Sequence, residues 1–178
     1  NNKIYGDRLP EPVRLKSDIL IALHRWDEAL AYRTQLLNRC VYLPWPVPMG
    51  KTEREILVNK FQRWIRHRSD DPAIWVFYGD IQYQLNYYSV ACEALDKALT
   101  LNSRLNWARY IRAKVLSAQG HYEASYVDIR QVCLDPRFLP EALILAGNIA
   151  AVLGRGSDSV RLFKRAIKLG FHRAESRY

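Results

Sequence analysis

The chain has 178 residues, of which 49% are hydrophobic and 25% are charged, and this length and composition predict one folded domain and exclude a disordered chain. No apolar stretch approaches the roughly 20 residues that a membrane-spanning helix needs, so we expect no membrane span in this chain. The formal net charge of +9 favours acidic partners, a nucleic acid or an anionic membrane surface, although an Arg-rich helical surface without any such partner has the same charge.

The first part of the chain predicts a helical hairpin. Residues 1–9 show no periodicity and are expected to form a flexible lead-in. Within residues 10–41, apolar side chains recur at helical spacing in two consecutive segments. This pattern predicts two helices that pack against each other as a first hairpin.

Residues 42–71 predict a Pro-rich loop followed by a basic helix. Three prolines within residues 43–50 remove backbone donors and fix φ, so this stretch is expected to be extended. Thr52 and Glu55 then have the spacing of a capping box, and apolar residues recur at helical spacing to about Arg68. We interpret residues 42–71 as an insertion, or as a degenerate repeat whose first helix has become the loop.

From residue 72 onwards the sequence repeats at a constant step of 34 residues. The copies span residues 72–105, 106–139 and 140–171, and each predicts two helices. Matching positions hold residues of the same kind, namely Gly79, Ala113 and Gly147; Ala91, Ser125 and Ser159; Leu95, Ile129 and Phe163; and Ala98, Val132 and Ala166. A fixed period with small and bulky sites in register predicts stacked helical hairpins, in which these positions have a packing role.

The copy that starts at Pro72 resembles the tetratricopeptide repeat (TPR) family. That family places Trp at the fourth position, small residues at the eighth and twentieth, a bulky residue at the twenty-fourth and Ala at the twenty-seventh, which here are Trp75, Gly79, Ala91, Leu95 and Ala98. The resemblance implies an all-α fold, a right-handed superhelix of stacked antiparallel helix pairs with about four hairpins and one irregular Pro-rich insertion, in a single domain over residues 1–178. It also implies a non-catalytic protein-interaction module or scaffold that assembles a larger complex.

By resemblance to the family, the ligand contacts come from particular positions on the concave side of each copy. The expected groove for a peptide ligand therefore contains Asp80, Tyr83, Gln84, Trp107, Tyr110, Lys114 and Asn148. Aromatic faces with a few polar anchors suit a peptide, a helix or another protein segment with apolar side chains. The alternative for the aromatic residues of the second copy is that they pack against a neighbouring repeat. The Lys and Asn with which TPR co-chaperones hold the C-terminal carboxylate of heat-shock proteins are absent from the matching positions, so a chaperone-tail function is not expected.

No motif brings together residues that would carry catalysis or bind a cofactor. The four His residues are scattered, and no metal-ligand spacing or Gly-rich phosphate loop occurs, so we expect no enzyme, no metal and no cofactor. Cys40, Cys92 and Cys133 are expected to be buried free thiols, which favours a reducing compartment such as the cytoplasm. The chain begins at Asn1 without Met, so it is expected to derive from a longer protein that carries any anchor or targeting segment elsewhere.

Nucleic acid is the alternative ligand. Arg63, Trp64, Arg66 and Arg68 cluster near the end of the basic helix, where the cations could follow a phosphate backbone and the indole could stack on a base. Basic residues also recur along the last expected helix, at Arg161, Lys164, Arg165 and Lys168. A related 35-residue helical repeat family reads RNA one base per repeat, but the 34-residue step matches the TPR pattern, so a protein ligand is favoured.

The Pro-rich loop has two interpretations. It is either a passive connector between two helices, or a functional element in which Trp45 inserts into the groove or into a partner. In the second case, residues 43–49 would contribute to the affinity for the partner.

Overall fold

The computed structural model describes residues 11–39, 41–135 and 141–175. Regular structure in these residues is entirely helical, which confirms the all-α architecture expected from the sequence. The helices are α1 (Glu11–Ala22), α2 (Trp26–Asn38), α3 (Lys51–His67), α4 (Pro72–Gln84), α5 (Tyr88–Leu101), α6 (Asn106–Ala118), α7 (Tyr122–Val132), α8 (Glu141–Val152) and α9 (Gly156–Glu175). The expected lead-in at residues 1–9 and the thiol of Cys40 lie outside the described residues.

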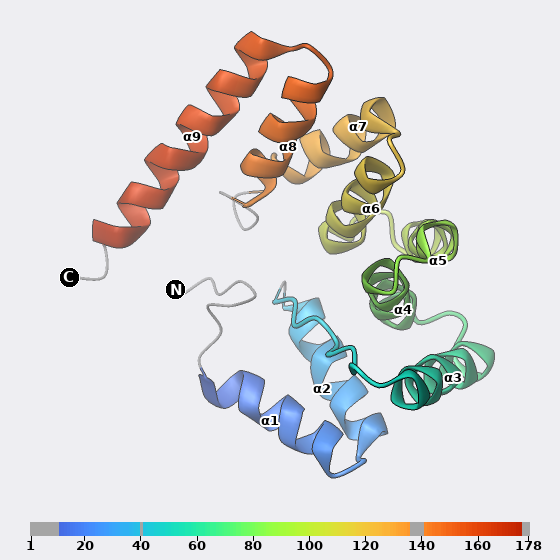
Figure 1. Ribbon diagram of the computed structural model, residues 1–178. Coiled ribbons are helices and arrows are strands. Elements are labelled where there is room, and N and C mark those ends of the chain that lie inside the picture. Colours follow the sequence, from blue (N-terminus) through green and yellow to red (C-terminus); the bar gives the residue numbers. More distant parts are fainter. Residues whose placement is uncertain (1–10, 40, 136–140, 176–178) are drawn as a thin grey trace.

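The helices follow one another round an arc (Figure 1). Helix α4 packs on α5, α6 on α7 and α8 on α9, and consecutive pairs are joined through contacts between α5 and α6 and between α7 and α8. Helices α4 and α6 lie on the inner side of the arc, and α5 and α7 lie on its outer side. Each pair therefore packs mainly on its neighbours along the chain, which is the construction of a helical solenoid.

The same kind of turn closes four helical hairpins. One residue in each turn has a left-handed backbone conformation, with φ of 56° at His24, 64° at Asn86, 80° at Gly120 and 71° at Gly154. In each turn the next residue donates its backbone N–H back into the preceding helix, as Arg25 does to the Leu20 carbonyl at 2.8 Å. The α1–α2 hairpin therefore has the turn of the three regular pairs, with His24 where those pairs have Asn86, Gly120 and Gly154.

Close approach of the helices within each pair depends on the small residues of the repeat. A Cβ atom added to Gly79 would lie 2.7 Å from Cγ of Leu95, and one added to Gly147 would lie 2.7 Å from Cε1 of Phe163. In the last pair the small residue of the second helix also forms a hydrogen bond, because the Ser159 hydroxyl donates to the Gly147 carbonyl at 2.9 Å. The small and bulky positions in register thus set the packing distance within each pair.

The starts of α3 and α4 differ. Asp71 caps α4, and its carboxylate accepts a hydrogen bond of 2.9 Å from the backbone N–H of Ala73. Helix α3 instead begins at Lys51 with Gly50 at its N-cap and no side-chain cap bond. The capping box expected at Thr52 is therefore wrong, because Thr52 already lies inside the first turn of the helix.

Candidate functional site

An extended Pro-rich segment, residues 41–50, runs between α2 and α4 and contacts both helices. Arg33 on α2 donates to the carbonyl oxygens of Leu43, at 2.7 Å, and of Pro44. Its Nε donates to the Ser17 hydroxyl at 2.7 Å. Burial lowers the pKa of Arg33 to about 10, so its side chain remains a cation at neutral pH. These bonds satisfy carbonyl groups that lie outside any helix, and they fix the segment against α2.

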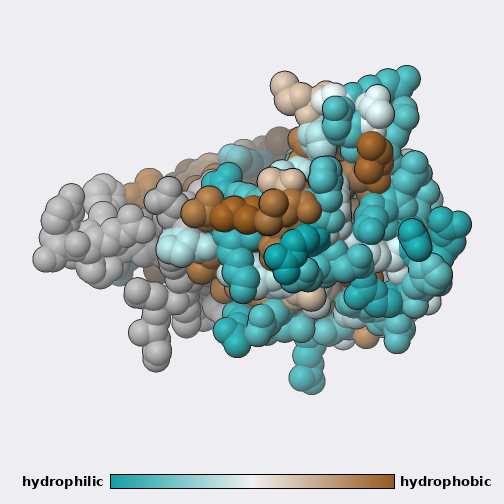
Figure 2. Space-filling view, turned by 90° about the horizontal axis from the view of Figure 1, so that it is seen from below, coloured by the Kyte–Doolittle hydropathy of each residue, from teal (hydrophilic) through white to brown (hydrophobic). Residues whose placement is uncertain are grey.

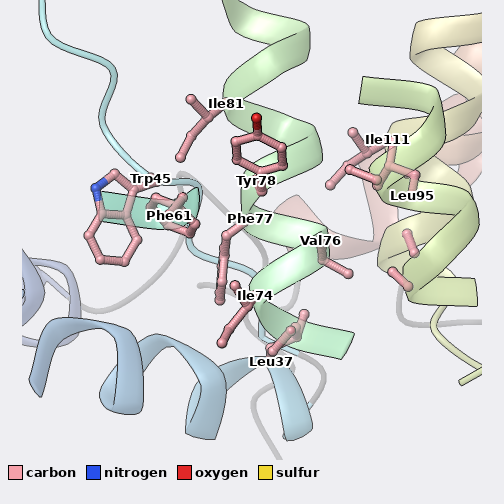
Figure 3. Close-up of a cluster of buried hydrophobic side chains, with 14 of the residues drawn as sticks. Leu37, Trp45, Phe61, Ile74, Val76, Phe77, Tyr78, Ile81, Leu95 and Ile111 are labelled. Atoms are coloured by element: carbon pink, nitrogen blue, oxygen red, sulfur yellow. The ribbon is translucent and has the colours of Figure 1, made fainter. Parts of the chain in front are cut away.

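Trp45, in the middle of the Pro-rich segment, is the centre of an aromatic cluster (Figure 3). Its ring centroid lies 5.1 Å from that of Phe61, 5.9 Å from that of Trp64 and 6.3 Å from that of Phe77. On the other side it stacks on Trp26 at 6.2 Å. The side chain is buried among α2, α3 and α4, so Trp45 is a core residue and is not available to a separate partner.

Tyr42 of the same segment covers the inner surface of α4. Its ring lies between Phe77 and Trp107, with centroid distances of 5.7 and 4.8 Å. Its hydroxyl donates to the Asp80 carboxylate at 2.8 Å, and the amide of Gln84 donates to the same oxygen at 3.0 Å. Burial raises the pKa of Asp80, while the hydrogen bond from Tyr42 and the charge of Lys114 act in the opposite direction. Asp80 is thus committed to internal bonds.

The inner surface beyond Tyr42 remains accessible on α4 and α6. Lys114 places its Nζ atom 4.7 Å from the ring centroid of Tyr83 and 5.9 Å from that of Tyr110. All three side chains are half-buried. Within the described residues Lys114 forms no ion pair. The arrangement presents a cation between two aromatic faces, which can accept a carboxylate next to an apolar side chain.

Comparison with solved structures identifies the architecture. The chain superposes on a crystal structure of MamA with a TM-score of 0.66 and 16% identity, covering 89% of this chain and 96% of that one. A second MamA structure gives a TM-score of 0.64 at 16% identity, with coverage of 92% and 93%. YrrB, described as a TPR protein with an unusual peptide-binding site, gives a TM-score of 0.58 at 15% identity, with coverage of 89% and 84%. The chain has a TPR fold. No protein-family model and no curated protein matches its sequence.

On this TPR fold the groove residues expected from the sequence separate into an accessible set and a set that the Pro-rich segment covers. Tyr83, Tyr110 and Lys114 lie together, as described above. Gln84 is exposed at the end of α4, and Asn148 is exposed on α8. The expectation for Asp80 as an open polar anchor is wrong, because Tyr42 covers it. Trp107 packs beneath Tyr42, so its ring is covered by the Pro-rich segment, which neither the open groove nor packing on a neighbouring repeat had anticipated.

Only part of the expected polyanion patch on α3 is open to a ligand. Arg63 and Arg66 are exposed. Trp64 is buried and donates from its indole Nε1 to Asp27 at 2.7 Å, so base stacking by Trp64 is excluded in this structure. Arg68 lies 3.7 Å from the same carboxylate. These contacts tie α3 to the start of α2.

A cavity beside the Pro-rich segment has no counterpart in the sequence reasoning. Its volume is about 400 Å³, and its walls come from α1, the Pro-rich segment and the end of α4, including Ile21, Pro44 and Gln84. An extended chain is thinner than a helix, whose diameter with side chains is about 10 Å. An extended segment that occupies a helix-sized space therefore leaves a cavity beside it. The sequence could not predict this cavity, because it does not show that residues 41–50 take the place of a helix in three dimensions.

The described residues also bear on the expectations for a membrane span, a metal site and free thiols. No helix there is both long enough and apolar enough to cross a bilayer. His, Cys, Asp and Glu side chains in the same part of the chain form no group of three that could hold a metal ion. Cys92 is half-buried and Cys133 is buried, both as free thiols, and burial raises the pKa of Cys133 to about 11.

Proposed function

We propose that the protein is an interaction scaffold that binds an extended peptide segment of a partner protein on the inner surface of α4, α6 and α8. The observation that carries this proposal is the position of Lys114 between Tyr83 and Tyr110. Among the described residues Lys114 forms no ion pair, so its ammonium group is available to a ligand carboxylate while the two rings offer an adjacent apolar surface. The TPR fold, and the peptide-binding site named for YrrB, support an interaction role of this kind.

The chemistry of this surface favours an acidic peptide with apolar neighbours. A carboxylate on the ligand would pair with Lys114, and apolar side chains would cover the exposed parts of Tyr83 and Tyr110. On α8 the exposed Ile144 and Asn148 continue the surface. Neither the sequence nor the fold assigns a reaction to these residues, so a binding role is the function that they support.

The proposal can be tested with arrays of extended peptides that differ only in charge. The native chain is expected to prefer acidic over basic peptides, and Lys114→Glu is expected to reverse this preference. Tyr110→Ala should weaken both classes, because it removes the apolar surface that they share. Lys97→Glu, which makes the same charge change on the exposed side of α5, is the matched control. An unchanged preference in Lys114→Glu would refute the assignment.

The same chain can be tested for nucleic-acid binding. A gel shift that weakens steeply between about 50 and 200 mM salt, and that Arg63→Glu with Arg66→Glu removes, would favour the alternative ligand. We expect any such shift to be weak, because the buried ring of Trp64 cannot stack on a base and only phosphate contacts remain.

A further inference from the structure

The outward face of α9 carries apolar side chains where the end of a solenoid normally carries polar ones. Val160 is 52% exposed and Ile167 is 57% exposed. The two residues are seven positions apart, so they lie on one side of the helix. No described helix packs on this side. Repeat arrays usually need polar outer faces at their ends to remain soluble, so the apolar character of this face requires an explanation.

The interior of the same molecule shows what such a face normally contacts. One repeat of 34 residues before Val160 lies Tyr126, which is 6% exposed, and the residues that correspond to Ile167 are Leu99 and Cys133, both 9% exposed. Leu99 belongs to the same apolar cluster as Ala108, Ile111 and Val115 of α6. These positions are therefore buried by the first helix of the next repeat. The face of α9 has the shape and spacing to receive a helix in the same way.

The opposite end of the solenoid has the matching surface. Leu15 and Ile19 on α1, and Leu23 directly after it, are about half exposed, at 54%, 47% and 59%. Counted in the same register, Leu15 and Ile19 correspond to Ile111 and Val115, which are buried in α6. Figure 2, which looks at the molecule from the side on which α1 lies, shows an elongated apolar patch surrounded by hydrophilic surface. Two copies could therefore meet head to tail if only the apolar residues mattered.

Charges at these ends oppose such self-association. Inside the molecule, Asp96 on α5 accepts a hydrogen bond of 2.5 Å from Arg112 on α6, across the contact between two repeats. The residue of α9 that corresponds to Asp96 is Lys164, and the residue of α1 that corresponds to Arg112 is Lys16. A head-to-tail contact would bring these two cations together, between chains that each carry a net charge of +9. Like charges at such a position select against the wrong partner.

We propose that the outward face of α9 is a docking site for an amphipathic helix of a partner protein that carries an acidic residue opposite Lys164. Val160 and Ile167 bury against the apolar side of that helix, as Tyr126 and Leu99 do inside the solenoid. Lys164, with the exposed Arg165 and Lys168 beside it, selects the acidic helix and rejects a second copy of this chain. The site is separate from the inner surface around Lys114, so the protein can hold two partner segments at once.

A stapled helical peptide made from residues 106–118 of the chain, with Arg112→Glu, is a suitable probe. The peptide carries the apolar residues of α6, and a Glu side chain replaces the Arg112 cation that pairs with Asp96 inside the molecule. The full chain is expected to bind it about fivefold more tightly than the same peptide with Arg112 retained. Lys164→Glu should reverse that order, and Ile167→Asp should abolish the binding of both peptides. Lys97→Glu, on the exposed side of α5, is the control and should change neither affinity.

Three results would overturn the proposal. The first is equal binding of the two peptides, or binding that survives Ile167→Asp. The second is concentration-dependent self-association of the native chain in sedimentation that Ile167→Asp removes, which would make a second copy the occupant. The third is pelleting of the chain with phosphatidylglycerol vesicles that Ile167→Asp prevents, which would make a lipid surface the occupant. Monomeric native chain that does not pellet with vesicles and shows the charge reversal supports the docking site.

Discussion

The parts of the molecule before and after Pro72 are held together in different ways. In α4–α9 the same positions recur in every helix pair, and a small residue in one helix admits a bulky residue of the next, as Gly147 admits Phe163. In residues 11–71 no such register connects α2 with α3. There, one buried Arg and a few aromatic rings around Trp45 fill the space.

This difference shows that an extended segment can take a helix-sized space in a solenoid when side chains fill the volume. The segment keeps its carbonyl groups paired through Arg33 and its aromatic residues packed. The cost is a strong dependence on single residues. Stability in α4–α9 should instead be a sum of similar nearest-neighbour contributions.

Trp45→Ala is expected to have the largest effect on stability. Removing a buried Trp side chain costs about 4 kcal/mol of the free energy of unfolding. The loss should be local, because the aromatic contacts of Trp45 with the described residues join α2 and α3 to α4 and reach no later helix. Hydrogen exchange should show lost protection in α1–α3 and retained protection in α6–α9. Uniform loss of protection would contradict the claim that residues 11–71 and α4–α9 are stabilised in different ways.

Arg33→Met is expected to be the next largest change. The variant leaves the Leu43 and Pro44 carbonyl groups without their donor inside the protein, which costs about 3 kcal/mol. Urea unfolding measures the effect. Arg39→Met is the control. Arg39 is exposed directly after the last residue of α2, so this variant should be nearly neutral. Similar values for the two variants would show that Arg33 does not fix the Pro-rich segment.

Tyr42→Phe is expected to cost about 1 to 2 kcal/mol at pH 8, because Asp80 loses a hydrogen bond while it remains buried. The bond from Tyr42 lowers the pKa of Asp80, so its loss raises that already elevated pKa further. A raised carboxyl pKa means that the native state binds the proton more readily, which adds stability as the pH falls. The difference between variant and native chain should therefore shrink as the pH is lowered from 8 into the range in which Asp80 takes up a proton. Tyr87→Phe, at an exposed position, should show no such dependence.

The smallest effect is expected for Arg155→Ala, which acts on the regular part. Arg155 pairs with Glu123 at 2.9 Å and lies 4.8 Å from the ring centroid of Tyr126. Glu123 is exposed and Arg155 is partly exposed, so solvent screens the ion pair and the loss should be below about 1 kcal/mol. Thermal unfolding can measure it. A loss as large as that of Arg33→Met would show that the regular repeats also depend on single polar contacts.

The helical architecture and the repeat register could be predicted from the sequence because both are local and periodic. The 34-residue step related Gly79 to Gly147 and Leu95 to Phe163, and in both copies the small residue lies against the bulky one. The resemblance to the TPR family, transferred position by position, placed Tyr83, Tyr110 and Lys114 on one surface. Prediction from the sequence failed for Asp80 and Trp64, because their partners Tyr42 and Asp27 lie 38 and 37 residues away, outside any repeat. Contacts between non-repetitive segments leave no periodic signal in the sequence.

The contact between Tyr42 and Trp107 also bears on the order of folding. The helix pairs from α4 onwards form through contacts between neighbours in the sequence, which close quickly. The Pro-rich segment has to reach from α2 to a surface that exists only after α4 and α6 have packed together. We therefore expect the segment to dock late, with the α4–α9 stack as its template, so that burial of Trp45 reports the last step on the folding pathway.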